Sequence, residues 1–228
     1  MRLFSVAGAC SRAGKTAAAV TLLRFLRSGS ASAVKFTTTE DVWERCPRGT
    51  PCVVCDIDVP FRVIEDPAVL GEPGTDTHRL LEAGARRVLW AIARHGAVQE
   101  AWRAVRNRLA AEERVVMEGS TIVGQAKPDR LVFVVHPFLS PSRWKPTSAA
   151  LLSEADIVVV NRPAAEVREP SAEVLEAVAG ARGHGRTRVA DVTRPLPEWA
   201  PDLAGDLASP SPIPADGLAH AHADITRP

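Results

Sequence analysis

The sequence contains few cysteines, no excess of either charge and no long apolar segment. Four cysteines in 228 residues are too few for a disulfide scaffold, so we expect a reducing, cytoplasmic environment. Lysine and arginine (28 residues) balance aspartate and glutamate (27 residues), which leaves no basic excess for non-specific nucleic-acid binding. The longest apolar runs, such as Leu131 to Val135, are far too short to span a bilayer. Composition therefore argues against a nucleic-acid-binding protein and against a membrane protein.

The composition is otherwise that of a globular domain, with 46% hydrophobic and 24% charged residues. Short runs rich in Val, Ile and Leu alternate with helical patterns, as expected for parallel strands buried on both faces and joined by helices. We expect strands at residues 3–7, 33–36, 52–57, 87–92, 114–117, 131–136, 156–160 and 188–192, and helices at residues 14–28, 77–84, 97–111 and 171–180. The sequence predicts an α/β fold with a doubly wound, mostly parallel sheet flanked by helices.

Three segments interrupt this alternation. Residues 40–50 and 60–74 are rich in Pro, Gly and charge, and we expect both to form loops over the carboxyl edge of the sheet. From Pro195 onward, Pro, Ala, Asp and Ser dominate and large apolar residues are few, which is typical of an extended or disordered tail. We therefore expect one domain at residues 1–194 and a tail at residues 195–228.

The strongest functional signal follows the first expected strand. Residues 9–16 read Ala-Cys-Ser-Arg-Ala-Gly-Lys-Thr and match the phosphate-loop (P-loop) pattern, with Ala9 in place of the first glycine. In such a loop the backbone N–H groups and a helix N-terminus surround the phosphates, Lys15 reaches the β- and γ-phosphates, and the Thr16 hydroxyl binds Mg²⁺. We expect a P-loop NTPase fold and binding of ATP or GTP by Ser11, Arg12, Ala13, Gly14, Lys15 and Thr16. A chance Gly-Lys-Thr at a helix start is the alternative.

A Mg²⁺ site also needs carboxylates, and two expected strands end in them. Asp56 and Asp58 end the strand that starts at Cys52, and Glu118 follows Val115 to Met117. A carboxylate at a buried strand end is costly without a partner. We therefore expect Asp56 and Glu118, together with Thr16, to hold the metal or its waters. Capping of a helix or pairing with arginine is the plain alternative.

The first 125 residues or so resemble the molybdopterin-guanine dinucleotide biosynthesis protein B (MobB) family. The likeness lies in residues 6–16, in Val34-Lys35-Phe36-Thr37, in Gly74 to Ala85 and in Met117-Glu118-Gly119. This resemblance implies a nucleotide-binding adaptor with weak GTPase activity that serves attachment of a nucleotide to the molybdenum cofactor. It further implies a partner protein of cofactor biosynthesis and a homodimer.

The sequence also resembles dethiobiotin synthetase, another family in the same branch of P-loop proteins. That family has a P-loop Lys and Thr, an Asp after the third strand, a Glu-Gly step and a Lys that ends the second strand, which fall here on Lys15, Thr16, Asp56, Glu118 and Lys35. The resemblance implies an ATP-dependent kinase or ligase that phosphorylates an acidic small molecule. It also implies that Lys35 faces the reacting anionic group and that Lys15, Lys35 and Glu118 are the catalytic residues. A surface lysine is the alternative for Lys35.

The choice between ATP and GTP depends on the segment after the strand at residues 156–160. Guanine-specific members resemble Asn-Lys-x-Asp there, whereas this chain has Asn161-Arg162-Pro163-Ala164 and so lacks the aspartate. We expect Asn161 to contact the nucleotide, as an asparagine in the dethiobiotin family does with adenine. Its alternative role is to cap the following segment.

Cys46, Cys52 and Cys55 invite a metal-binding interpretation and a third class of function, a metallochaperone NTPase. However, residues three apart on a strand point to opposite faces, so Cys52 and Cys55 cannot bind one ion if they lie in a regular strand. Buried structural cysteines are the favoured interpretation.

Overall fold

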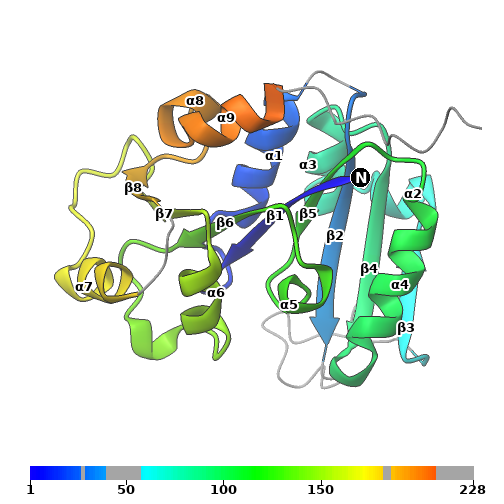
Figure 1. Ribbon diagram of the computed structural model, residues 1–228, viewed down its shortest axis with the longest axis horizontal. Helices are drawn as coiled ribbons and strands as arrows, with labels where there is room; N and C mark the ends of the chain where they lie inside the picture. Colours follow the sequence, from blue (N-terminus) through cyan, green and yellow to red (C-terminus); the bar gives the residue numbers. More distant parts are fainter. Residues whose placement is uncertain (27–28, 40–57, 182–185, 209–228) are drawn as a thin grey trace, which may run out of the picture.

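The computed structural model of the 228-residue chain describes residues 1–26, 29–39, 58–181 and 186–208. In these ranges eight strands form one sheet in the order β3-β4-β2-β5-β1-β6-β7-β8 (Figure 1). Neighbouring strands are parallel except for the antiparallel pair β3 and β4. The strands are β1 (Arg2–Gly8), β2 (Ser32–Thr39), β3 (Phe61–Ile64), β4 (Val88–Arg94), β5 (Arg114–Glu118), β6 (Arg130–Val135), β7 (Ile157–Asn161) and β8 (Arg186–Ala190). The predicted α/β, doubly wound, mostly parallel sheet is confirmed.

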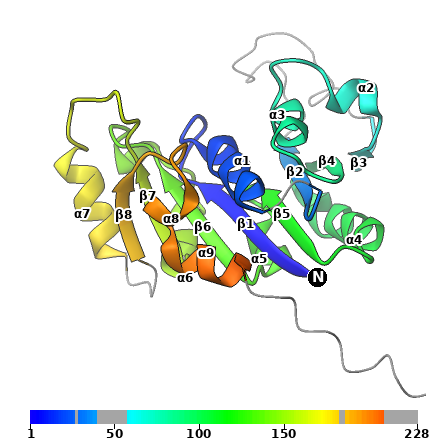
Figure 2. The ribbon, with the colours of Figure 1, turned by 90° about the horizontal axis from the view of Figure 1, so that it is seen from above.

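Helices cover both faces of this sheet (Figure 2). They are α1 (Lys15–Phe25), α2 (Pro67–Leu70), α3 (Asp76–Glu82), α4 (Val98–Arg108), α5 (Val123–Ala126), α6 (Ser148–Glu154), α7 (Ala172–Gly180), α8 (Leu196–Trp199) and α9 (Pro201–Ala208). Alternate residues of β1 show the two layers. Phe4 and Val6 pack in one apolar cluster with α1, α3, α8 and α9, whereas Leu3 and Ala7 pack in clusters with α4, α6 and α7. The central strand β1 is therefore buried on both sides.

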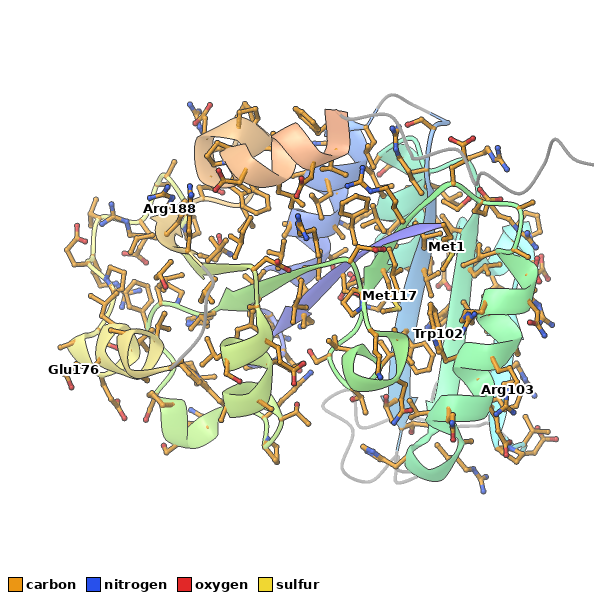
Figure 3. All side chains as sticks on the ribbon, viewed as in Figure 1. Met1, Trp102, Arg103, Met117, Glu176 and Arg188 are labelled. Atoms are coloured by element: carbon orange, nitrogen blue, oxygen red, sulfur yellow. The ribbon has the colours of Figure 1, made fainter. Side chains whose placement is uncertain are left out.

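Helix α4 illustrates how the sequence pattern sets the packing. Val98, Trp102 and Val105 recur at helical spacing and are buried, whereas Arg103 is exposed. Trp102 shares an apolar cluster with Met117 of β5, and both are labelled in Figure 3. With 11 residues, α1 and α4 are short, and the part of the chain that the structure describes has no helix long and apolar enough to cross a membrane.

The segment at residues 60–74 differs from the predicted loop. Residues 61–64 form the edge strand β3, which pairs with β4 in the antiparallel direction, and Asp66 caps the short helix α2 through the N–H of Ala68. Antiparallel strands can pair without a crossover helix between them, so the alternation of strands and helices along the sequence does not predict β3. Residues 40–57, which include the other predicted loop and the predicted strand at 52–57, lie outside the described residues.

The prediction that an extended tail begins at Pro195 is wrong for residues 195–208. These residues form α8 and α9, which pack against α1 and bury Leu196, Trp199, Leu203 and Leu207. The four apolar residues recur every three or four positions, a helical spacing that the Pro- and Ala-rich composition hides. Residues 209–228 lie outside the described residues.

Candidate functional site

The P-loop connects the carboxyl end of β1 to the first residue of α1. Arg12 (φ 60°) and Gly14 (φ 109°) adopt the left-handed conformation in it. Residues of this kind let a loop turn successive N–H groups toward a bound anion. At Gly14 a side chain is excluded for a second reason, because a Cβ atom would lie 2.3 Å from Nδ2 of Asn161. The sequence motif thus folds as a strand, a tight loop and a helix, the arrangement that the P-loop pattern requires.

The N-terminus of α1 is left open toward the loop. Among the residues that the structure describes no side chain caps it, and its first turn carries no acidic residue. The first N–H groups of a helix have no partner within the helix and carry a partial positive charge. An N-terminus without a cap or a nearby carboxylate is therefore suited to receive an anion.

Lys15 folds back over the loop. Its Nζ donates a hydrogen bond to the carbonyl oxygen of Cys10 at 2.9 Å. Burial lowers the pKa of Lys15, although the charge of Glu118 opposes this effect. Phosphate oxygens would offer this ammonium a stronger partner than a neutral carbonyl.

Three oxygen-bearing side chains meet at the start of α1. The Thr16 hydroxyl lies 2.9 Å from Oδ1 of Asp76 and 2.9 Å from Oε2 of Glu118. Asp76 is the first residue of α3, and Glu118 is the last residue of β5 and is buried. A hydroxyl has one proton, so it can donate to only one of these carboxylates at a time. The oxygen of the other carboxylate then receives no proton from Thr16 and can accept another donor or bind a cation.

Lys35 neutralises the same two carboxylates from the other side. Its Nζ lies 2.6 Å from Oδ2 of Asp76 and 2.7 Å from Oε1 of Glu118. Burial alone would lower the pKa of Lys35, but the charges of Glu118 and Asp76 outweigh it and the pKa is raised. Burial would raise the pKa of Asp76, but Lys35 and the Thr16 hydroxyl reverse this effect and the pKa is lowered. Lys35 and Asp76 are therefore both charged at neutral pH.

These groups open into one cavity of about 610 Å³ at the carboxyl edge of the sheet. Its walls come from the P-loop, the ends of β2 and β5, helix α3 and the loop between β6 and α6. The lining residues are Ser11, Arg12, Gly14, Lys15, Thr16, Ala17, Lys35, Phe36, Thr37, Thr38, Asp76, Arg79, Glu118, Gly119, Ser120, Thr121 and Lys145. Large ligands bind at this edge in open α/β sheets.

Most residues predicted for the site from the sequence lie around this cavity. The residues that line it are Ser11, Arg12, Gly14, Lys15, Thr16, Lys35 and Glu118. Ala13 does not line it, because its side chain is buried in the core. Two groups that the sequence did not predict as metal or phosphate ligands also line it, Asp76 beside Thr16 and Lys145 of the β6–α6 loop. The acidic start of α3 was a signal for Asp76. Lys145 follows Trp144 in a loop, where no pattern marks it.

Asn161, at the end of β7, contacts the P-loop itself. Its Nδ2 donates to the carbonyl oxygen of Ala13 at 3.0 Å, and its Oδ1 accepts from the N–H of Val192 at 3.3 Å. The amide therefore ties the P-loop to the segment that follows β8. This is a positioning role that the sequence did not predict, and contact with a nucleotide base stays a prediction.

Two other predictions fall on residues that the structure does not describe. These are the metal-binding role of Asp56 and the fate of Cys46, Cys52 and Cys55. Within the described ranges there is no cluster of three or more His, Cys, Asp or Glu side chains that could hold a metal ion. Comparison with known proteins adds no assignment, since no family model and no curated protein matches the chain.

Proposed function

We propose that this chain is a Mg²⁺-dependent P-loop NTPase that binds ATP or GTP and hydrolyses it or transfers its terminal phosphoryl group. One observation carries the proposal. The Thr16 hydroxyl lies 2.9 Å from carboxylate oxygens of Asp76 and Glu118, directly beside the uncapped N-terminus of α1. This arrangement offers an anion site and a cation site next to each other, which is what a metal–nucleotide complex requires.

The side chains at this point fit Mg²⁺. Hydroxyl and carboxylate oxygens are the ligands that this ion prefers, and Mg²⁺ commonly takes one or two carboxylates together with substrate phosphates and water. Thr16, Glu118 and Asp76 would hold the ion, with Asp56 as a further candidate from the sequence. When bound, Mg²⁺ supplies positive charge that offsets the charge of the phosphates.

The residues of the chain itself account for binding and for charge stabilisation. The N–H groups of the loop and of α1 would hold the phosphates, and Lys15 would exchange the carbonyl oxygen of Cys10 for phosphate oxygens. Lys35 uses two of its three N–H donors on Asp76 and Glu118. Within the described part of the chain the third donor has no acceptor, so it could bind an anionic group beside the terminal phosphate.

The biological role follows from the sequence resemblance and is part of the proposal. The MobB-like segments favour a cytoplasmic homodimer that serves molybdopterin nucleotide biosynthesis together with a partner protein. The alternative is an ATP-dependent kinase or ligase that acts on an acidic small molecule. One observation favours this alternative, because Thr37, Thr38 and Arg79 also line the cavity and would offer an acidic acceptor hydrogen-bond donors and a positive charge.

Phosphate release tests the proposed reaction. The wild-type chain is incubated with ATP or GTP in Mg²⁺ or in a chelator, and Thr16→Val serves as an isosteric variant without the hydroxyl. We expect phosphate release that requires Mg²⁺ and falls at least about 100-fold in Thr16→Val, as expected for loss of a metal-holding group. Release that is independent of Mg²⁺, or unchanged in Thr16→Val, would contradict the proposal. Candidate acidic acceptors then separate the two roles, because only a kinase or ligase is accelerated by its acceptor.

A further inference from the structure

Lysine is rare in this chain and is concentrated at the cavity. The sequence has four lysines, Lys15, Lys35, Lys127 and Lys145, among 28 basic residues. Lys15, Lys35 and Lys145 all line the cavity of about 610 Å³, although they come from three separate segments of the chain. Lysine presents a compact positive charge on a flexible stem, whereas arginine presents a planar guanidinium. Lys15 and Lys35 have assigned contacts, which leaves the role of Lys145 to be explained.

The backbone fixes Lys145 against the first residue of the P-loop. Its N–H donates to the carbonyl oxygen of Ala9 at 2.8 Å, and the hydroxyl of Ser148, the first residue of α6, lies 3.4 Å from the same oxygen. Ser148 also donates its backbone N–H to the carbonyl oxygen of Lys145 at 2.9 Å. The β6–α6 loop is thus joined to the P-loop by hydrogen bonds, and Lys145 is held at the cavity wall.

The ammonium of Lys145 has no fixed partner in this position. Among the described residues, no carboxylate forms an ion pair with it and no acceptor forms a hydrogen bond with it. Burial lowers the pKa of Lys145, and the nearby charge of Lys35 acts in the same direction. A partly buried cation without a partner is costly, and an anion in the cavity would remove that cost.

The groups around Lys145 indicate which part of a nucleotide it faces. It interacts electrostatically with Cys10 at the start of the loop, and with Lys35 and Glu118 at the place proposed for the metal. A metal ion held by Thr16, Glu118 and Asp76 would offset the charge of the terminal phosphates, whereas the N–H groups of the loop would hold the α- and β-phosphates. Lys145 therefore lies at the end of the cavity that suits the terminal phosphate.

We propose that Lys145 is a further phosphate-binding residue, which contacts the γ-phosphate of the nucleoside triphosphate from the β6–α6 loop. This inference rests on the proposed function and deepens it. It places three lysines around the transferred group: Lys15 from the P-loop, Lys35 from β2 and Lys145 from outside both. An ammonium there stabilises charge on the terminal phosphoryl group and distinguishes a triphosphate from a diphosphate.

Binding affinities for triphosphate and diphosphate test this role. Dissociation constants are measured in Mg²⁺ for non-hydrolysable ATP and GTP analogues and for ADP and GDP, with wild type, Lys145→Met and Lys145→Arg. We expect Lys145→Met to weaken triphosphate binding by about 10- to 100-fold, the effect of losing a charge-assisted hydrogen bond, and to change diphosphate binding by less than about 3-fold. Lys145→Arg keeps the charge and is expected to retain most of the preference for triphosphate.

Lys127→Asn is the matched control. Lys127 is exposed, lines a different cavity and adopts a left-handed conformation (φ 46°) that asparagine tolerates. We expect its affinities for both nucleotides to equal those of the wild type. An unfolding transition measured for each variant shows whether the fold is intact, and Lys145→Arg provides the readout if Lys145→Met does not fold.

Three outcomes would overturn the assignment of Lys145. Unchanged triphosphate binding in Lys145→Met would place its ammonium away from the γ-phosphate. An equal loss of triphosphate and diphosphate binding would mean that Lys145 supports the loop or an inner phosphate instead. Failure of the wild type to bind any nucleotide would contradict the proposed function as well, and so differs from the first two outcomes.

Discussion

Lys35 in the middle of β2 and Glu118, the last residue of the neighbouring parallel strand β5, are register partners, and their charged atoms lie 2.7 Å apart. Glu118 is only 2% exposed, and a buried carboxylate is costly unless a partner such as this ammonium lies beside it. Lys35 also holds Asp76, and both carboxylates lie beside the Thr16 hydroxyl. The pair therefore fixes the acidic half of the site next to the P-loop.

Removal of Lys35 should destabilise the fold and make it depend on Mg²⁺. In Lys35→Met the buried charge of Glu118 has no lysine partner, and we expect the free energy of unfolding in urea to fall by about 3 kcal/mol. The double variant Lys35→Met/Glu118→Gln should recover part of this loss because the unpaired charge is gone. Added Mg²⁺ should stabilise Lys35→Met more than the wild type, since the ion would replace the ammonium. Equal stability of Lys35→Met and wild type would contradict this account of the pair.

Asp76 should contribute stability at neutral pH that is lost in acid. Its pKa lies below the ordinary value of 3.8 in the folded state. A carboxyl group whose pKa is lower in the folded state stabilises the fold above its unfolded pKa and loses this effect as the pH falls through the folded pKa. We expect wild type to be more stable than Asp76→Asn at about pH 7, and the difference to shrink toward about pH 3. Urea unfolding over this range measures it, and a difference that does not change with pH would count against the pairing.

Gly14 should not tolerate a side chain. In Gly14→Ala the Cβ atom would meet Nδ2 of Asn161 at 2.3 Å and alanine would have to adopt φ 109°, so we expect a loss of about 2 to 4 kcal/mol in stability and a loss of nucleotide affinity. Gly124→Ala in α5 is the control, because nothing lies within 4 Å of its added Cβ, and it should match or slightly exceed wild type. The double variant Gly14→Ala/Asn161→Ala should cost less than the sum of the single changes. Strict additivity in denaturant unfolding would show that the two residues do not meet.

Trp199 should be essential to the packing of α8 on the core. Its side chain is fully buried, and its indole Nε1 donates to the carbonyl oxygen of Arg194 at 3.1 Å. We expect Trp199→Ala to lower the free energy of unfolding by about 3 to 5 kcal/mol. Leu175 of α7 is 38% exposed, and Leu175→Ala should cost less than about 1 kcal/mol. Similar small effects of both substitutions would mean that residues 195–208 are not part of the folded domain.

The sequence was sufficient to predict the fold class and those site residues that belong to a continuous motif or lie in an expected strand. The P-loop is a continuous motif and Glu118 ends an apolar run, so their places follow from the rule that parallel strands end at one edge. Lys35 lines the cavity as expected, but it lies in the middle of β2, which continues to Thr39, and not at the strand end that the resemblance implied. Asp76 and Lys145 were not predicted as metal or phosphate ligands because they come from a helix start and a loop. Their positions depend on how α3 and the β6–α6 loop pack against the P-loop, which no local period encodes.

Composition was misleading where a few apolar residues decide the packing. Between residues 195 and 208 Pro and Ala make up six of fourteen residues, yet Leu196, Trp199 and Leu203 recur at helical spacing and are buried. At residues 60–74 the Pro and Gly residues suggested a loop, whereas β3 pairs with β4 through its backbone. Backbone pairing at a sheet edge depends on a neighbour distant in sequence, so the local residue pattern did not indicate it.

Whether the chain binds a nucleoside triphosphate can be measured by titration calorimetry with Mg²⁺ complexes of non-hydrolysable ATP and GTP analogues, with Lys15→Ala as the variant that lacks the P-loop ammonium. We expect saturable binding of one nucleotide per chain, dependent on Mg²⁺ and weakened at least about 10-fold in Lys15→Ala. A clear preference for ATP would favour the kinase or ligase role, and a preference for GTP would favour the MobB-like role. A wild-type chain that binds neither complex would contradict the claim that this site receives a nucleoside triphosphate.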